Sequence, residues 1–343
     1  MALYEALNNE TYIKERDKWF GRLTDLFAGK NDTGKVFVLW GYDVRGTSDP
    51  LTEPEKWVDE ALARIADEFA AYIMNGIRFA PSGVEYDIYG VHFIDKVFGA
   101  NVFRNGDQWY SEYLKTPIGS LEMPDLDHNE TFQLSVRAAK RFAEVGGRFP
   151  IFALPVIASP LNIAINLYGQ DILIEMVENP EKARKDLETI TDVLVKAHET
   201  FRKIVPARQL QPVGPGGRTQ PSCYGQICGC STQLVSGELY RDLLSDLDER
   251  VLGVYENGGM IHLCGAHTQH METFRGMKKL RALQLNDRAA DDFEEYFNNL
   301  RDDQIIYLNP SEKMPVERAL EISGGKRLVV VSWLDHDLPI KEK

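Results

Sequence analysis

The sequence has few cysteines, no basic cluster and no long apolar run, and each shortage excludes a class of protein. Four cysteines in 343 residues are too few for the disulfide framework of a small secreted domain. No apolar run reaches the length of a membrane span, and residues 1–10 hold acids where a signal peptide needs a basic segment and an apolar core. The net charge of −13 disfavours nucleic acid as a partner. We therefore expect a cytoplasmic protein with no membrane or nucleic-acid partner.

Several common catalytic signatures are also missing. No Gly-x-Gly-x-x-Gly follows the first apolar strand, which disfavours a dinucleotide site. The run Gly214-Pro215-Gly216-Gly217 lacks the Lys-Ser/Thr ending of a phosphate loop, and we interpret it as a bend. No Gly-x-Ser-x-Gly element marks a hydrolase nucleophile. The chemistry must therefore be sought in other residues.

Strand and helix patterns alternate along the chain. The run from Lys35 to Trp40 is too apolar to have a wet face, which is typical of a parallel sheet buried on both sides. Helix-length segments separate the expected strands, which start near residues 35, 78, 149, 209, 259, 280, 304 and 327. This rhythm predicts an α/β fold of the (β/α)8 type, a TIM barrel, as a single domain over residues 1–343. An open doubly wound sheet is the alternative.

Capping signals place the main helices. Asn9 can cap a helix over residues 9–28, which we expect to form an N-terminal helical cover within residues 1–30. The run Thr52-Glu53-Pro54-Glu55 is a capping box with proline early in the first turn. Further helices are expected over residues 129–145, 161–177, 180–204 and 236–255, whereas residues 77–118 are expected to be irregular.

The chemistry concentrates at a His-x-Cys pair. His262 and Cys264 are two residues apart on a predicted strand, so their side chains leave the same face. They could fill two of the four coordination positions of a zinc ion. Catalytic zinc takes three protein ligands and keeps the fourth position open. The candidates for the third ligand are Cys223, Cys228, Cys230 and Asp287. The alternative is that the cysteines are small core or loop residues.

Other candidates follow from the barrel rule that catalytic groups lie at the carboxyl ends of strands. Three candidates for catalysis are Asn286, Asp287 and Tyr42, and four for substrate binding are Trp40, Arg45, Tyr224 and Trp333. Ordinary roles compete with these: Asp287 could cap the following helix, and the aromatic residues could belong to the core. His267 and His270 could support the metal ligands, but an exposed helix face is the preferred interpretation.

Several strings in the second half of the chain resemble the uroporphyrinogen decarboxylase superfamily. They are Ser-Gly-Glu-Leu-Tyr-Arg-Asp-Leu-Leu from Ser236, then Ile-His-Leu-Cys-Gly, then Leu-Asn-Asp. The likeness extends to Leu167-Tyr168-Gly169-Gln170-Asp171, Asn179-Pro180-Glu181 and Asn309-Pro310, so it covers roughly residues 85–335. The resemblance implies a (β/α)8 barrel, an architecture similar to that of cobalamin-independent methionine synthase.

The resemblance implies one of two activities. True decarboxylases carry an Arg-x-Pro-x-Trp-x-Met-Arg run near the N-terminus, where this chain has only Tyr42-Asp43-Val44-Arg45. The methyltransferase branch includes coenzyme M and O-demethylating enzymes that work with corrinoid proteins, and its His-x-Cys zinc pair maps onto His262 and Cys264. In coenzyme M methyltransferases a further cysteine ends the last strand, where this chain has Ser332-Trp333. Cys228, Cys230 or Asp287 would have to replace it.

We therefore expect a zinc-dependent methyltransferase that moves a methyl group between a small methylated substrate and a corrinoid (cobalamin) protein. The substrate would be a methyl ether, a methylamine or a thiol, Asp287 would assist as acid or orienting base, and the chain could act as a homodimer. One alternative is a metal-independent, uroporphyrinogen decarboxylase-like lyase that binds an anionic substrate through Arg45. The other is a corrinoid- or tetrapyrrole-binding module without catalysis.

Overall fold

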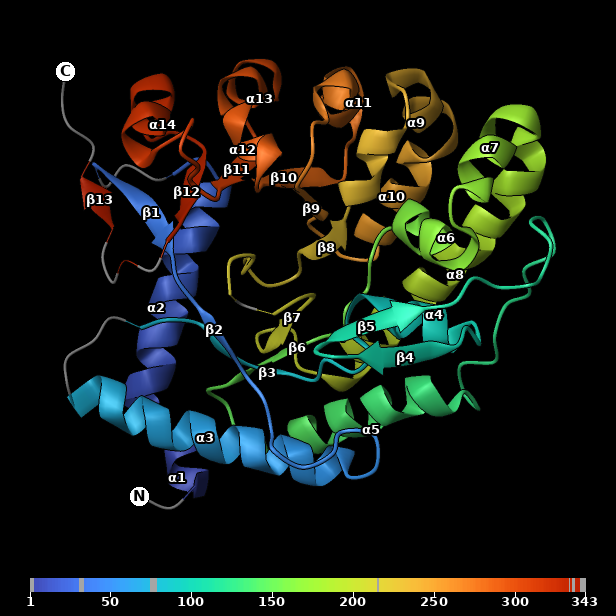
Figure 1. Ribbon diagram of the computed structural model, residues 1–343. Coiled ribbons are helices and arrows are strands. Elements are labelled where there is room, and N and C mark those ends of the chain that lie inside the picture. Colours follow the sequence, from blue (N-terminus) through green and yellow to red (C-terminus); the bar gives the residue numbers. More distant parts are fainter. Residues whose placement is uncertain are drawn as a thin grey trace.

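The computed structural model describes residues 3–30, 34–74, 79–214, 216–332, 334 and 337–339. It has an α/β architecture in which parallel strands surround the centre and helices pack outside them (Figure 1). The larger sheet holds, in spatial order, β13 (Leu338–Pro339), β1 (Lys35–Leu39), β12 (Leu328–Val331), β11 (Ile305–Leu308), β10 (Leu280–Leu285), β9 (Gly259–Leu263) and β8 (Gly225–Cys228). The smaller sheet holds β2 (Tyr42–Val44), β3 (Ser82–Glu85), β6 (Ile151–Ala153) and β7 (Leu210–Gln211).

The two sheets share one stretch of chain. Only Trp40 and Gly41 separate β1 from β2, so this stretch leaves one sheet and enters the other. At the far edges, β7 and β8 are joined through residues 212–224 without a recorded pairing between them. The expected parallel order and outer helices are confirmed, while the strand pairs of the described residues form two open sheets rather than a closed ring. Strand β8 was not expected, because its residues were assigned to the cysteine loop.

Most expected helices are present. Helix α2 (Glu10–Phe27) begins after Asn9, whose side chain accepts backbone hydrogen bonds as a cap. The expected helix over 161–177 is divided at Gly169, where φ is 65°. The other described helices are α1 (Leu3–Leu7), α3 (Pro54–Met74), α4 (Phe93–Val97), α5 (Glu130–Val145), α6 (Pro160–Tyr168), α7 (Asp171–Glu178), α8 (Pro180–Ile204), α9 (Gly237–Leu243), α10 (Ser245–Leu252), α11 (Met271–Gly276), α12 (Arg288–Asp291), α13 (Phe293–Asn299) and α14 (Val316–Ser323).

A hairpin and three single-turn helices complete the described chain. Residues 102–111 form an antiparallel hairpin of β4 (Val102–Asn105) and β5 (Gln108–Ser111), within the region expected to be irregular. The single-turn helices span Gly90–His92, Cys230–Leu234 and Thr268–His270. Among the described residues, no helix combines the length and the apolar character that crossing a membrane requires.

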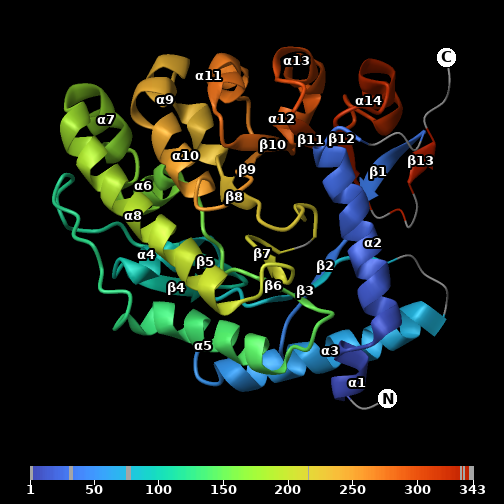
Figure 2. The ribbon, with the colours of Figure 1, turned by 180° about the vertical axis from the view of Figure 1, so that it is seen from behind.

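The core has two parts because side chains alternate across each strand. The outer part lies between the sheets and the helices, and the inner part includes Phe37, Met260, Tyr307 and Val329. Helix α2 closes the inner part at the amino ends of the strands, where it adds the buried side chains Trp19, Leu23, Leu26 and Phe27. Figure 2 shows this helix crossing the near side. The carboxyl ends of the strands are therefore the end at which polar side chains can gather.

Candidate metal and acid-base site

Three neighbouring strands bring a sulfur, an imidazole and an amide side by side. Cys228 on β8 pairs in register with His262 on β9, and His262 pairs with Gln284 on β10. Paired residues of parallel strands send their side chains to the same face of the sheet. That face is the inner one, since Met260, two residues before His262, belongs to the inner core. The three side chains thus converge above this core, near the carboxyl ends of their strands.

Hydrogen bonds fix the imidazole of His262. Its Nδ1 lies 2.6 Å from Oε1 of Gln284, and Nε2 of Gln284 donates to Oδ1 of Asn309 at 2.9 Å. Because the Gln284 oxygen can only accept, Nδ1 of His262 carries the proton and Nε2 keeps a lone pair. Burial, with a smaller effect of Arg218, lowers the pKa of His262 to about 4. At neutral pH His262 is therefore a neutral imidazole, the form in which a histidine can bind a metal ion.

Cysteine sulfurs lie beside that imidazole. The Sγ atoms of Cys228 and Cys230 are 3.4 Å apart, and together with a ring nitrogen of His262 they form a set of donor atoms within 4.8 Å of one another. One nitrogen and two sulfurs are the donor types that zinc prefers. The sulfur of Cys264 is bonded to that of Cys230 as a disulfide. A disulfide sulfur is not a thiolate, so Cys230 and Cys264 can bind metal only when reduced.

The set of close donor atoms differs in one member from the pair that the spacing suggested. The spacing paired His262 with Cys264, whereas the set of mutually close donor atoms contains Cys228 and Cys230 beside His262. Cys264 follows the end of β9 and reaches the same group only through its bond to Cys230. Reduction of that bond would free the sulfurs of Cys230 and Cys264 as thiols.

Two buried histidines hold the cysteine segments together. Nδ1 of His267 lies 3.0 Å from Oγ1 of Thr232, which donates to the carbonyl oxygen of Gly229 at 2.8 Å. Nε2 of His267 accepts a hydrogen bond from the backbone of Gly265. His270 bonds the carbonyl oxygen of Thr232 at 2.8 Å. Both histidines are fully buried, so the preferred interpretation of an exposed helix face was wrong, and their role here is to fix the loop geometry.

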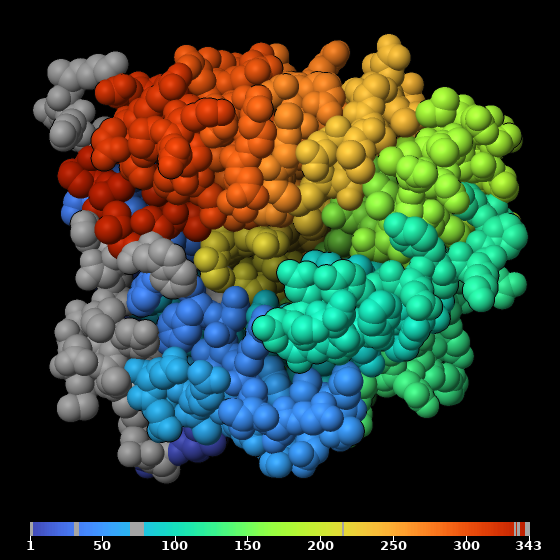
Figure 3. Space-filling view, in the orientation of Figure 1, coloured from blue at the N-terminus to red at the C-terminus, as the bar shows by residue number. Residues whose placement is uncertain are grey.

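A polar cavity of about 200 Å³ adjoins this group. Its lining residues are Asp43, Glu85, Val213, Gly214, Gly216, Gly217, Arg218, His262, Gln284, Asn286 and Asn309. A Cβ at Gly214 would lie 2.6 Å from Oδ1 of Asp43 and 2.7 Å from Oε1 of Glu85. Both carboxylates therefore leave no room for a side chain at this position. In Figure 3 the yellow part of the chain lies recessed between the orange and red part above it and the blue part below it.

The carboxyl group of Asp43 has a raised pKa. Burial by the surrounding wall and the nearby charge of Glu85 raise the pKa of Asp43 to about 7, against the opposing effects of Arg45 and Arg218. Asp43 is nevertheless reached by water, which is consistent with a position at the mouth of the cavity. A carboxyl group that titrates near neutral pH can both give and accept a proton during turnover.

Two arginines flank the carboxylates in different ways. Nε of Arg45 donates to Glu85 at 3.0 Å, and its NH2 group pairs with Asp87 at 3.0 Å, while the side chain is 55% exposed. Arg45 is thus an ion-pair partner at the rim and does not line the cavity, although substrate binding was expected of it. Arg218 lines the cavity and forms no hydrogen bond or ion pair with another described residue. Its guanidinium is positioned to form an ion pair with an anionic group bound in the cavity.

The structure places one of the other expected site residues at the cavity and the rest of those that it describes away from it. Asn286 lines the cavity, but Asp287 is exposed, has a φ of 46° and lies outside the lining. Tyr42 packs against the outer core and its ring lies 6.2 Å from that of Trp40. Neither ring lines the cavity. Along β2, the alternation of side chains directs Asp43 there instead of Tyr42. Trp333 lies outside the described residues.

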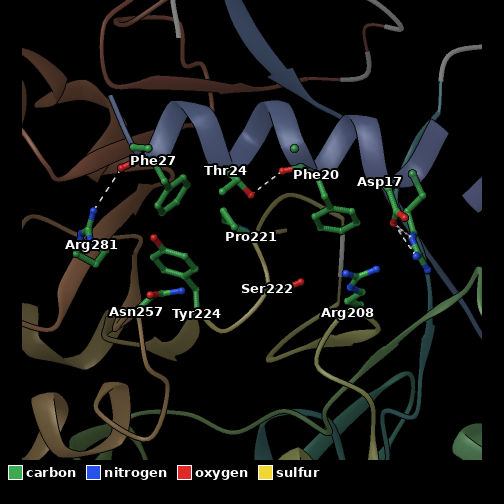
Figure 4. A pocket seen from close by; sticks show the side chains of 13 residues that line it. Asp17, Phe20, Thr24, Phe27, Arg208, Pro221, Ser222, Tyr224, Asn257 and Arg281 are labelled. Carbon is green, nitrogen blue, oxygen red and sulfur yellow. Dashed lines mark hydrogen bonds and ion pairs between the residues drawn. The ribbon is translucent and has the colours of Figure 1, made fainter. Parts of the chain in front are cut away.

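Tyr224 lies at the opposite end of the strands, so its expected place in the substrate pocket was wrong. It precedes β8, which begins at Gly225, and its ring lies 4.8 Å from that of Phe27 on α2. Figure 4 shows it in a pocket of about 640 Å³ under α2. The other labelled residues there are Asp17, Phe20, Thr24, Phe27, Arg208, Pro221, Ser222, Asn257 and Arg281. The sequence did not predict β8, and a loop in its place would put Tyr224 at the carboxyl ends of the strands.

Comparison with known proteins supports the architecture. No model of a known protein family matches the sequence, and no curated protein matches it either. The fold matches that of a methyltransferase from Methanosarcina mazei with a TM-score of 0.60, over 91% of this chain and 92% of that one. The two chains are 14% identical. At this identity the comparison shows a shared fold, and the chain is accordingly similar in architecture to a methyltransferase.

Proposed function

We propose that the chain is a zinc-dependent methyltransferase that moves a methyl group between a small methylated substrate and a corrinoid protein. The observation that carries the proposal is the convergence of His262, Cys228 and Cys230, with their donor atoms within 4.8 Å, beside a polar cavity. The shared fold with a methyltransferase supports it. We include in the proposal that the two sheets act as one interrupted (β/α)8 barrel, with the site at its carboxyl end.

His262 would hold zinc through Nε2, together with thiolates from the group Cys228, Cys230 and Cys264. Three of these donors would leave one coordination position for the substrate heteroatom. Bound zinc supplies a Lewis acid that polarises this heteroatom. Hydrogen bonds from His262 through Gln284 to Asn309 keep the imidazole in the ligating tautomer and orientation.

Asp43 takes the acid-base role that the sequence assigned to Asp287. In its protonated form it can donate to an oxygen or nitrogen from which the methyl group leaves, and as a carboxylate it can accept the proton of an attacking thiol. Burial, assisted by the negative charge of Glu85, keeps the proton on Asp43 up to about neutral pH. Asn286 and Asn309 offer amide groups that orient a small substrate in the cavity. The corrinoid protein would deliver or remove the methyl group at the open carboxyl end.

Metal analysis under reducing conditions tests this proposal. We expect about one zinc ion per chain in the unmodified protein and strong loss in His262→Ala and Cys228→Ser. His128→Ala is the matched control, because His128 is exposed and its ring pairs with Asp125 on the surface. Negligible zinc in both the unmodified protein and His262→Ala would overturn the proposal.

A second function, a metal-independent lyase acting on an anionic substrate, has one specific observation in its favour. Arg218 offers a guanidinium inside the cavity, where its charge acts on Glu85 and Asp43 across the open space, and the same cavity holds the proton donor Asp43. Turnover that survives chelation of metal and is lost in Arg218→Ala would favour the lyase. Arg45→Ala is the control, since Arg45 serves Glu85 and Asp87 at the rim.

A further inference from the structure

Cys230 belongs to two arrangements that exclude each other. Its sulfur lies 3.4 Å from that of Cys228, within the set that includes His262, and it is also bonded to the sulfur of Cys264. A sulfur atom that shares its electrons in a disulfide is not available as a thiolate ligand. The oxidised chain therefore keeps only Cys228 and His262 as donors, which is fewer than the three that a catalytic zinc site needs.

We propose that the Cys230–Cys264 pair is an oxidation site that competes with metal binding, so that a peroxide releases the metal and a thiol reductant restores the site. This inference rests on the proposed metal site. In a reducing compartment the two residues stay as thiols and the site can load. Oxidation closes the disulfide and removes both sulfurs from the donor set at once.

The backbone permits both states without rearrangement. The Cα atoms of Cys230 and Cys264 are 5.5 Å apart, within the range that a disulfide spans. Their segments are held in place from both sides: the backbone N–H of Gly229 donates to the carbonyl oxygen of His262 at 2.8 Å, and Thr232 contacts His267 at 3.0 Å. The same fixed backbone keeps Cys230 beside Cys228 and His262. Only side-chain chemistry has to change between the metal-binding and the disulfide state.

Both cysteines are accessible to a small oxidant. Cys230 and Cys264 are partly exposed, while His262, two residues before Cys264, is buried. The thiolate of Cys230 and the thiol of Cys264 together lose two electrons and form one sulfur–sulfur bond. Hydrogen peroxide accepts the two electrons, takes one proton from the Cys264 thiol and one from solvent, and leaves as two water molecules. The metal leaves as the free divalent ion.

The test follows zinc and disulfide in the same sample. Reduced, zinc-loaded protein is treated with hydrogen peroxide, the released zinc is measured with a chromogenic chelator, and non-reduced peptides are mapped by mass spectrometry. We expect loss of the bound zinc together with a Cys230–Cys264 linked peptide, and dithiothreitol should reverse both. Cys223→Ser is the matched control: Cys223 lies before β8 at its amino end, so this variant should respond as the unmodified chain does.

Two variants separate this inference from the proposed function. Cys228→Ser should still form the Cys230–Cys264 link, although it loses zinc, whereas Cys264→Ser cannot form the link. Zinc release without the linked peptide, or the linked peptide with zinc retained, would overturn the inference while leaving the metal site intact. Failure of the reduced, unmodified chain to bind zinc at all would instead refute the proposed function.

Discussion

Replacing Gln284 by leucine probes how the sheet tunes the proposed metal site. Oε1 of Gln284 accepts the bond from Nδ1 of His262 at 2.6 Å, and its Nε2 group is held by Asn309 at 2.9 Å and by the carbonyl oxygen of Gly217 at 3.2 Å. Leucine has a similar volume but accepts no hydrogen bond. The imidazole of His262 would then lose the bond that fixes both its tautomer and its orientation.

Loss of such a supporting bond typically costs about 10–100-fold in metal affinity, which corresponds to about 1.4–2.7 kcal/mol. We expect the dissociation constant for zinc to rise by this factor in Gln284→Leu. The assay is a competition titration of the reduced protein against a chelator of known affinity, with unfolding measured in parallel.

Gln304→Leu is the matched control for this experiment. Gln304 is also fully buried, and its Nε2 group donates to the carbonyl oxygens of Phe274 and Leu280, at the amino end of the same sheet. Both variants lose hydrogen bonds to buried carbonyl oxygens and should be less stable, but only Gln284→Leu should bind zinc more weakly. Unchanged affinity in Gln284→Leu, or an equal loss in both variants, would refute the reasoning.

Three further predictions concern the cavity and its supports. The pKa of Asp43 is raised to about 7, above its ordinary value near 4, so the folded chain binds more protons than the unfolded chain between these pH values. The stability contributed by this residue therefore falls as pH rises through that window. Asp43→Asn should raise the melting temperature more at pH 8 than at pH 4, and equal shifts at both pH values would contradict this. Gly214→Ala should abolish turnover with little loss of zinc, because the added Cβ would contact the carboxylates of Asp43 and Glu85. Gly276→Ala should retain full activity, because Gly276 has open space around it. Thr232→Val removes the bonds to Gly229 and His267 and should lower the free energy of unfolding by about 1–3 kcal/mol in a denaturant titration; no change would show that this network does not hold the loop.

The sequence was most informative where a pattern had one structural solution. The buried apolar runs predicted parallel strands, and β1 and β9 to β12 lie where they were expected. The spacing of His262 predicted an inward imidazole at the carboxyl end of its strand, and the residue is 6% exposed beside the cavity. In such strands, burial on both faces leaves little freedom in the position of each residue.

The sequence was less informative where the structure depends on a short element or on the phase of a strand. β8 is only four residues long and begins with glycine, so it carries no periodic signal, and without it Tyr224 was assigned to the wrong end. β2 places Asp43 rather than Tyr42 toward the cavity, and a shift of one residue reverses such an assignment. Arg218 was missed altogether, because it follows a glycine-rich bend and only the folded loop brings its charge near Asp43, Glu85 and Cys228. The position of the arginine after that bend was the one available signal.

Zinc K-edge X-ray absorption of the reduced, zinc-loaded chain tests the central claim most directly. The proposed site predicts a first coordination shell with sulfur at about 2.3 Å and at least one imidazole nitrogen at about 2.0 Å. The sulfur contribution should fall in Cys228→Ser and the imidazole contribution should disappear in His262→Ala. A shell of oxygen and nitrogen alone, unchanged in both variants, would place the metal elsewhere and contradict the proposed function.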